Sequence, residues 1–153
     1  MEQNETTIRN FYAAFQARDG NGMAACYHPE VQFSDPVFTD LKGPRAGAMW
    51  KMLCEGGSDL SIELGDVATD GSNGSAHWEA RYTFTTGRKV HNRIDASFEF
   101  MDDKIIVHRD SFDLHSWASQ ALGLPGRLFG GLPFLQNKIR ATAMNRLDKY
   151  ISR

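Results

Sequence analysis

The chain has 153 residues and a formal net charge of −2 at pH 7, with basic and acidic side chains interspersed along its length. No block of Lys and Arg could follow a phosphate backbone, so nucleic acid is not an expected partner. No apolar run approaches the ~20 residues that cross a bilayer, and the polar N-terminus predicts no signal peptide. We therefore expect a cytoplasmic protein without a membrane partner.

A hydrophobic content of 41% is enough for a core, and the chain shows no linker or internal repeat, so we expect residues 1–153 to form one domain. Cys26 and Cys54 lie in helical patterns without a partner motif and are expected to be buried thiols. Four histidines lack the paired spacing typical of zinc ligands: His77, His91, His108 and His115. We expect neither a metal nor a cofactor.

The first third of the chain has mainly helical periodicity. Apolar residues over Thr6–Arg18 recur at helical spacing and predict an amphipathic helix. A short helix is predicted over Met23–Tyr27, followed by a short strand over Glu30–Asp35. A third helix is predicted over Ala46–Glu55, with Pro44 in its first turn.

From residue 58 the period becomes that of strands. Polar and apolar residues alternate over Leu60–Leu64, Ser75–Thr85 and Val90–Met101, and a β-branched run begins at Lys104. Tight turn signals separate these segments, which predicts an antiparallel meander. Because helices come first and strands follow, the pattern indicates an α+β fold.

The segment Lys104–Leu114 is unusual because it places titratable side chains inside an apolar strand. Since side chains alternate faces along a strand, we expect Ile106, His108, Asp110 and Phe112 to share one face. A carboxylate and an imidazole beside apolar neighbours are typical of an acid–base site. The alternative is a strand that runs out of the core into solvent.

The C-terminal part is apolar but interrupted by Gly and Pro over Leu122–Leu135. A last helix follows, and its apolar residues form one stripe: Ile139, Ala143, Leu147, Tyr150 and Ile151. This part could cover the open end of the sheet, form a lid over a pocket, or make a dimer contact.

The order of these elements resembles the NTF2-like superfamily, and it is most similar to SnoaL-like and ketosteroid-isomerase-like proteins. The segments Phe33–Val37 and Lys104–Leu114 carry the resemblance most specifically. It implies a cystatin-like cone in which N-terminal helices cover a curved antiparallel sheet, here with an extra C-terminal helix. This fold hosts both enzymes and binding proteins, so the resemblance alone does not name a reaction.

The resemblance to ketosteroid isomerase implies that Asp35, just before Pro36, occupies the position of the proton-abstracting carboxylate. Phe11 and Ala96 fall at the positions of the two oxyanion donors. Because loss of such donors costs orders of magnitude in rate, steroid isomerisation by that mechanism is not expected.

The segment Lys104–Leu114 is also similar to a strand of limonene epoxide hydrolases. That similarity implies that Asp110 activates water, with Glu79 at the second acid and His77 at the bridging Arg. It requires His77 and Glu79 to face inward. Otherwise they belong to a solvated row on the outer face of the sheet.

The leading site candidates are therefore Asp35 and Asp110, followed by His108. Two carboxylates in one apolar cavity push their titrations apart, so that one serves as base and the other as acid. The alternative for Asp35 is a turn aspartate that caps the amides of Val37 or Phe38. The alternative for Asp110 is a salt bridge to a neighbouring Arg, and for His108 a hydrogen-bonded pocket wall.

These residues predict a cofactor-independent acid–base enzyme of the isomerase, cyclase or hydrolase type that acts on a small, largely apolar molecule. The expected pocket walls are mostly aromatic: Phe11, Tyr12, Phe15, Phe33, Trp50, Ala96, Phe98 and Phe112. A non-catalytic protein that shelters a small ligand is the alternative. We also expect a homodimer, and a purely structural dimer module is a third possibility.

Overall fold

The structure is a computed structural model, and it describes residues 2–153. The N-terminal part comprises α1 (Glu2–Gln16), α2 (Gly20–Ala25), β1 (Tyr27–Ser34), β2 (Leu41–Lys42) and α3 (Pro44–Gly56). The long strands follow: β3 (Ser61–Asp70), β4 (Asn73–Thr83), β5 (Lys89–Met101) and β6 (Lys104–Ser111). Three helices end the chain: α4 (Leu114–Leu122), α5 (Leu124–Phe129) and α6 (Pro133–Ser152).

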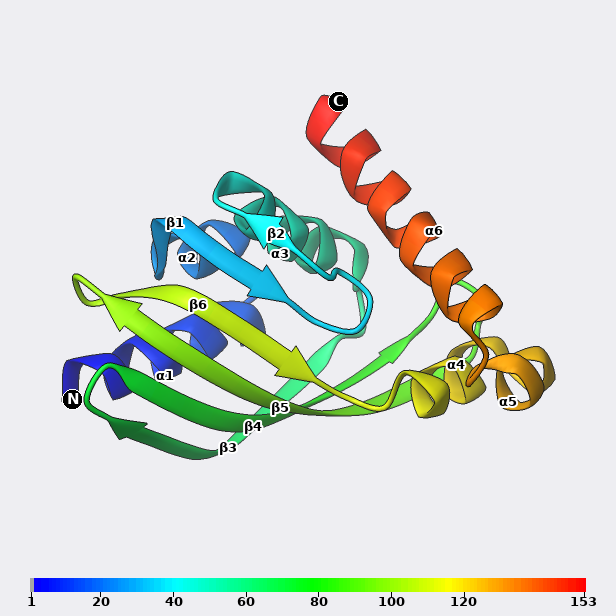
Figure 1. Cartoon of the computed structure of the whole chain (residues 1–153), viewed down its shortest axis with the longest axis horizontal. Coiled ribbons are helices and arrows are strands. Elements are labelled where there is room, and N and C mark those ends of the chain that lie inside the picture. Colours follow the sequence, from blue (N-terminus) through cyan, green and yellow to red (C-terminus); the bar gives the residue numbers. More distant parts are fainter. Residues whose placement is uncertain (1) are drawn as a thin grey trace.

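The six strands form one curved, open sheet in the order β2-β1-β6-β5-β4-β3 (Figure 1). The α+β architecture is confirmed, and β3 to β6 form the expected antiparallel meander. One pairing departs from a purely antiparallel sheet, because β1 lies parallel to β6. Alternation along β1 indicates which side chains face the core, but it does not identify the neighbouring strand.

Helix α1 lies against the sheet and buries four large side chains at helical spacing, namely Ile8, Phe11, Tyr12 and Phe15. The short helix predicted over Met23–Tyr27 is placed too late in the sequence. The Asp19 carboxylate accepts a hydrogen bond from the Gly22 amide at 2.9 Å and caps α2 at Gly20. Tyr27 instead opens β1, where it is buried.

A β-bulge in β6 changes which side chains share a face. Val107 pairs with Glu99 and Ile105 with Phe100, so Ile106 is the extra residue. Ile105 is therefore buried on the same face as His108, whereas we expected Ile106 there. Alternation in the sequence cannot reveal such an insertion, because the bulge depends on the partner strand.

The chain leaves the sheet earlier than predicted. The Asp113 carboxylate accepts a hydrogen bond from the Ser116 amide at 3.1 Å and so caps α4. The predicted strand runs to Leu114, and no helix is predicted over residues 115–121. Asp directly before a helix is a capping signal, but the apolar residues before Asp113 favour a longer strand.

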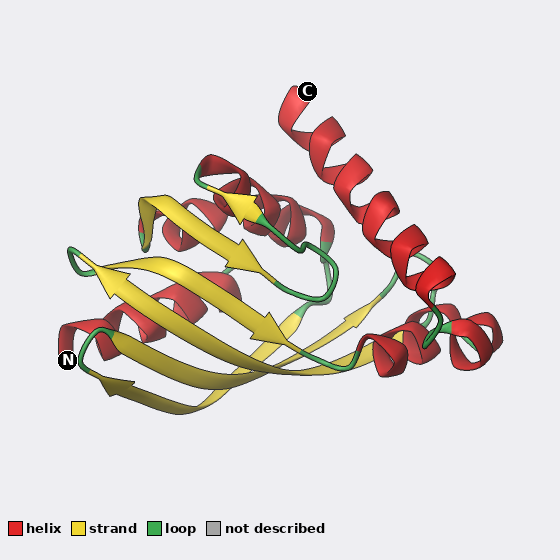
Figure 2. Cartoon of the chain, viewed as in Figure 1, coloured by secondary structure: helices red, strands yellow, loops and turns green. Residues whose placement is uncertain are grey.

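Helices α4 and α5 lie at one end of the sheet, and α6 extends back past α3 to the C-terminus (Figure 2). Leu147 is the buried residue of α6. Arg45 on α3 pairs with Asp148 on α6 at 2.9 Å. Over residues 2–153, no helix combines the length and apolar character needed to span a bilayer.

Candidate active site

A cavity of about 750 Å³ lies between the concave face of the sheet, α3 and α6. Met49 and Trp50 of α3 form one wall, Trp78 and Tyr82 of β4 form the floor, and Ile139 of α6 contributes the opposite wall. The volume is in the range of sites for small ligands, which bind in mainly apolar clefts with a few polar groups. The C-terminal helix is thus part of the cavity wall.

Asp35 and Asp110, the two leading candidates, both line this cavity. They lie far apart in the sequence. Ser34 at the end of β1 pairs with Arg109 on β6, so the next residue of each strand reaches the same level of the sheet. The parallel pairing of β1 with β6 is therefore what brings the two carboxyl groups together.

The Asp35 side chain is held by its own turn. Its Oδ1 atom accepts hydrogen bonds from the backbone amides of Val37 at 2.7 Å and Phe38 at 2.6 Å. The turn-capping alternative is thus correct for one oxygen, while the residue also lines the cavity. Among residues 2–153, the Oδ2 atom has no hydrogen-bond partner, so the second oxygen is available to a ligand.

Burial raises the pKa of Asp35 from 3.8 to about 7. The amides of Phe38 and Val37 act in the opposite direction, and the negative charge of Asp110 raises the pKa further. Removing water from around a carboxylate penalises its charged form, and a second carboxylate adds to that penalty. Asp35 therefore titrates near neutral pH, where it can both accept and return a proton.

Asp110 is held by buried hydrogen bonds. The Nε2 atom of His108 lies 2.9 Å from Asp110 Oδ1, and the two side chains are 0% and 2% exposed. The indole N–H of Trp78 donates to the same oxygen at 3.4 Å. Arg109, the adjacent Arg, faces away and pairs with Glu99 at 3.5 Å, so the salt-bridge alternative for Asp110 is wrong.

The hydrogen bonds continue behind His108. Its Nδ1 atom lies 2.8 Å from Tyr27 Oη, and the indole N–H of Trp50 donates to that hydroxyl at 2.7 Å. With Trp50 as donor, the Tyr27 hydroxyl satisfies both of its roles when it donates to Nδ1. The imidazole then carries its proton on Nε2 and donates it to Asp110. This order fixes the histidine tautomer that supports the carboxylate.

Aromatic rings close off this buried chain. The rings of Phe11, Phe33 and Phe98 lie 5.5, 5.0 and 4.5 Å from the His108 ring, measured between centroids. His108 thus lies in a dry shell and reaches the cavity only through Asp110, in agreement with the alternative of a hydrogen-bonded wall.

The predicted pocket walls divide into two groups. Phe15, Trp50 and Phe112 line the cavity. The expectation that the other five do so is wrong, since they are buried in the core beneath it: Phe11, Tyr12, Phe33, Ala96 and Phe98. Phe11 and Tyr12 belong to α1 itself, which packs on this part of the sheet, and the Tyr12 ring lies 6.4 Å from that of Phe98 between centroids. Face assignment from the sequence does not predict which part of a face a helix covers.

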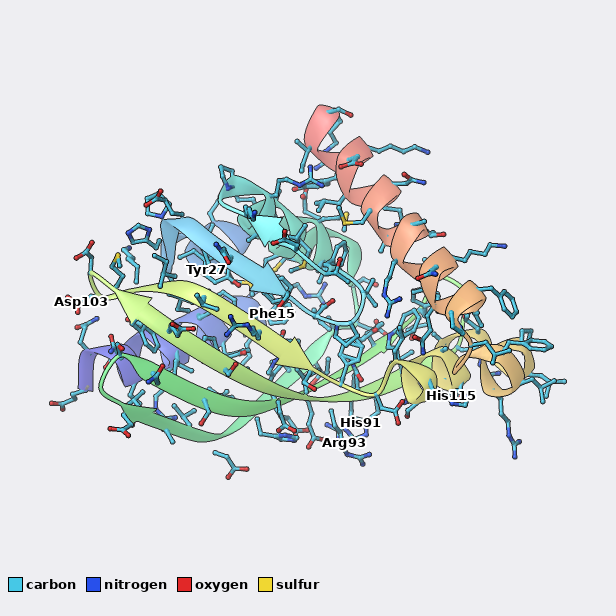
Figure 3. The ribbon with its side chains drawn as sticks, viewed as in Figure 1. Phe15, Tyr27, His91, Arg93, Asp103 and His115 are labelled. Atoms are coloured by element: carbon cyan, nitrogen blue, oxygen red, sulfur yellow. The ribbon has the colours of Figure 1, made fainter. Side chains whose placement is uncertain are left out.

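His77 and Glu79 lie outside the cavity, which is a correction to the site inferred from the epoxide-hydrolase similarity. Glu79 pairs across the sheet with Arg93, and Figure 3 shows Arg93 on the side of the sheet opposite Phe15 and Tyr27. Glu79 contacts His77 at 2.8 Å and His91 at 2.6 Å in a surface cluster. The alternation with buried Trp78 forces this outward orientation.

Tyr82 and Asn92 are among the polar cavity residues that the sequence analysis did not single out. Tyr82 accepts a hydrogen bond from the indole of Trp117 on α4 at 2.7 Å. Its place on the Trp78 face was visible in the alternation, but we treated that face only as core. Trp117 lies on the unpredicted helix, so no pattern we used could reveal the contact.

Over residues 2–153, no group of three or more His, Cys, Asp and Glu side chains is arranged to hold a metal ion. The cavity offers a half-buried carboxyl group, a second carboxylate with fixed donors, and neutral hydrogen-bonding groups in apolar walls. Lys138 and Arg146 of α6 add two basic side chains to its lining.

The sequence profile of the SnoaL-like domain matches residues 8–108, which is more than half of the chain. This chain belongs to the SnoaL-like family. The match includes Asp35 and ends at His108, so Asp110 and the C-terminal helices of this SnoaL-like domain lie beyond it. A comparison with curated proteins gives no match.

Solved structures share the fold of this SnoaL-like domain. A candidate SnoaL-like polyketide cyclase from Jannaschia sp. CCS1 aligns with a TM-score of 0.69 and 18% identity, over 81% of this chain and 94% of that one. An LEH-like epoxide hydrolase from M. tuberculosis aligns at 0.67 and 18%, over 84% and 96%. TerC, crystallised with polyporic acid, aligns at 0.67 and 19%, over 77% and 97%. The predicted family resemblance is confirmed.

Proposed function

We propose that this SnoaL-like domain is a cofactor-independent acid–base enzyme that acts on a small, largely apolar molecule, of the isomerase, cyclase or hydrolase type. The observation that carries the proposal is the pair of carboxyl groups in one apolar cavity, of which Asp35 has a pKa of about 7. A general acid or base works best when its pKa is near the working pH.

Asp35 is the proposed proton carrier. Its Oδ1 atom is anchored by two amides, while Oδ2 faces the ligand. In an isomerisation, Oδ2 accepts a proton from carbon, the electron pair moves into the adjacent unsaturated group, and the protonated carboxyl returns the proton at a second position. The sequence is balanced without any oxidant or reductant. Anchoring one oxygen limits the motion needed before each transfer.

Asp110 is the proposed partner. Its charge keeps the pKa of Asp35 high, and the hydrogen-bond chain through His108 and Tyr27 holds its orientation. In a hydrolytic reaction, Asp110 would instead orient a water molecule. The printed names of the structural neighbours, a candidate polyketide cyclase and an epoxide hydrolase, are consistent with acid–base chemistry on small molecules.

The test is a screen of lactones, epoxides and enones with purified protein, followed by pH–rate profiles for any substrate found. We expect Asp35→Asn and Asp110→Asn to lower kcat/KM by at least 100-fold, since a positioned acid or base typically contributes about 10²–10⁴-fold. Asp70→Asn, at the exposed end of β3 and outside the cavity lining, is the matched control. Full activity in both site variants would exclude this assignment.

The second candidate is a protein that binds a small molecule without converting it. The hydrogen bonds that Asp35 accepts from two backbone amides favour this second candidate, because they give the carboxylate a structural role that needs no catalysis. Native mass spectrometry distinguishes the two. A co-purified molecule that is recovered unchanged after incubation supports binding, whereas its conversion to a product supports catalysis.

We also propose a homodimer. The segment around α5 leaves large apolar side chains exposed, and such surfaces often mark contacts: Leu124, Leu128, Phe129, Leu132 and Phe134. Light scattering at several concentrations measures the mass directly, and a monomer at all concentrations would exclude the dimer.

A further inference from the structure

The hydroxyl of Tyr82 is a hydrogen-bond acceptor towards the protein and a free donor towards the cavity. The indole N–H of Trp117 lies 2.7 Å from Tyr82 Oη, and an indole nitrogen can only donate. Tyr82 must therefore accept that bond. Among residues 2–153, Oη has no further side-chain partner, so its own proton is available to a group inside the cavity.

Contacts on α4 hold this hydroxyl in place. Trp117 is buried, and its ring meets that of Phe84 edge-on at 5.1 Å between centroids. Tyr82 itself contacts both hydrophobic clusters of the protein. A donor whose direction is fixed before the ligand arrives binds the ligand without the cost of ordering it.

Tyr82 and Asp35 face the same cavity. Both line the cavity. Burial raises the pKa of Tyr82, the hydrogen bond from Trp117 lowers it, and the charge of Asp35 raises it. The raised pKa keeps Tyr82 protonated at neutral pH, as a donor must be.

The Asp110 side chain is only 2% exposed, and its Oδ1 atom is already bound by His108 and Trp78. Asp35 uses only its Oδ1 atom in hydrogen bonds among residues 2–153. Asp35 is therefore the carboxyl group that is free to act on the same ligand as Tyr82.

We propose that Tyr82 donates its O–H to a carbonyl oxygen of the ligand, and that the substrates are apolar carbonyl compounds whose acidic C–H group faces Asp35. This inference rests on the proposed acid–base function. When Asp35 removes the proton from the carbon beside the carbonyl group, the C–H electron pair forms the new C=C bond and the carbonyl π pair moves to oxygen. The resulting enolate oxygen then receives the Tyr82 hydrogen bond, and the proton remains on Asp35 until it returns to carbon.

The two oxyanion donors of ketosteroid isomerase are missing here, and Tyr82 offers a donor at another place in the cavity. Tyr12 is the other candidate, because its buried hydroxyl has no hydrogen-bond partner among residues 2–153. Tyr12 does not line the cavity, however. Its hydroxyl lies in the core, where a ligand cannot reach it.

The experiment compares two probes of similar shape, 2-acetylnaphthalene, which has a carbonyl oxygen, and 2-isopropylnaphthalene, which has none. Their affinities are measured by equilibrium dialysis for wild type, Tyr82→Phe and Tyr12→Phe. We expect Tyr82→Phe to weaken the ketone about tenfold, the value of one hydrogen bond, and to leave the hydrocarbon within about twofold. Tyr12→Phe should leave the preference for the ketone unchanged.

A second readout is direct. With the ¹³C-labelled ketone bound, the infrared carbonyl stretch should lie at lower wavenumber in wild type than in Tyr82→Phe, because a hydrogen bond weakens the C=O bond. Equal affinities and equal stretches in the two proteins overturn the role of Tyr82. Failure of the ketone to bind wild type overturns the carbonyl class as well.

The test of Tyr82 can fail or succeed independently of the test of the proposed acid–base function. Asp35→Asn keeps Tyr82 in place and should retain the Tyr82-dependent carbonyl shift. If Asp35→Asn and Asp110→Asn keep full turnover while the shift depends on Tyr82, the acid–base assignment fails and the donor stands. If they lose turnover while the shift does not depend on Tyr82, the donor fails and the acid–base assignment stands.

Discussion

His108 Nε2 lies 2.9 Å from Asp110 Oδ1, and the two residues are neighbours on one face of the same strand. Strand geometry alone therefore brings them together. The remaining hydrogen bonds, from Trp50 on α3 to Tyr27 on β1 and from Tyr27 to His108 on β6, require three elements to meet. A cavity carboxylate is thus linked to the core by hydrogen bonds that no solvent reaches.

The buried hydroxyls allow a matched pair of stability predictions. Tyr27→Phe leaves the Trp50 indole and His108 Nδ1 without partners, and each unpaired buried group costs about 1–3 kcal/mol. We expect it to lower the free energy of unfolding by about 2–4 kcal/mol. Tyr12→Phe removes a hydroxyl that has no partner and should be neutral or stabilising by up to about 1 kcal/mol. Urea unfolding of both variants measures the contrast, and equal losses would contradict the assigned bonds.

Asp35 should make stability fall with increasing pH. Its pKa is 3.8 in the unfolded chain and about 7 in the folded protein, so between these values the folded state binds more protons and unfolding becomes easier as pH rises. At about 1.4 kcal/mol per unit, this amounts to roughly 4 kcal/mol above pH 7.

Asp35→Asn retains an oxygen for the Val37 and Phe38 amides but carries no charge. The variant should therefore gain stability relative to wild type by roughly 3 kcal/mol between pH 4.5 and pH 8.5. Urea unfolding at both pH values measures this, with Asp70→Asn as control. If the free energies of unfolding of variant and wild type differ by the same amount at both pH values, the pKa of Asp35 is not raised in the folded protein.

The pH dependence of turnover follows from the same group. If Asp35 is the base, it must be ionised, so kcat/KM for a substrate identified in the screen should rise as pH increases through about 7. Asp110→Asn removes a cause of the raised pKa and should move the residual profile to lower pH. A profile that stays at the same pH in this variant would argue against electrostatic coupling of the two residues.

The outer cluster should affect stability without affecting the cavity. Asp95 and Glu79 raise the pKa of His77, so the cluster stabilises the fold below about pH 6.5 and this contribution is lost as pH rises through the raised pKa. Glu79→Gln should lower Tm more at pH 5.5 than at pH 8.5. The affinity of this variant for 2-acetylnaphthalene should equal that of wild type. A changed affinity would show that the outer cluster influences ligand binding in the cavity.

Leu147 should control the wall formed by α6. It is fully buried, while most of that helix is exposed. Leu147→Ala should cost about 2–5 kcal/mol and increase hydrogen exchange across residues 133–152. Leu128→Ala, at an exposed position, is the control and should leave exchange in α6 unchanged. Protection of α6 that survives Leu147→Ala would show that its surface ion pairs suffice to hold it.

The sequence by itself determined the class of fold, the family and the two carboxylates. Helical spacing in α1 and alternation in β4 and β5 are local consequences of backbone geometry, so they can be read without knowing any partner. The same alternation put Asp110 and His108 on one face. It also placed Trp78 inside, which implied that His77 and Glu79 point outward.

Only the tertiary structure decided which faces meet. The parallel pairing of β1 with β6 brings Asp35 beside Asp110, the bulge replaces Ile106 with Ile105, and the position of α1 separates covered core residues from cavity walls. The Tyr82–Trp117 bond likewise depends on where α4 lies. Each of these is a contact between segments far apart in the chain, whose free energy depends on the partner as well as on the residue, so no local pattern encodes it.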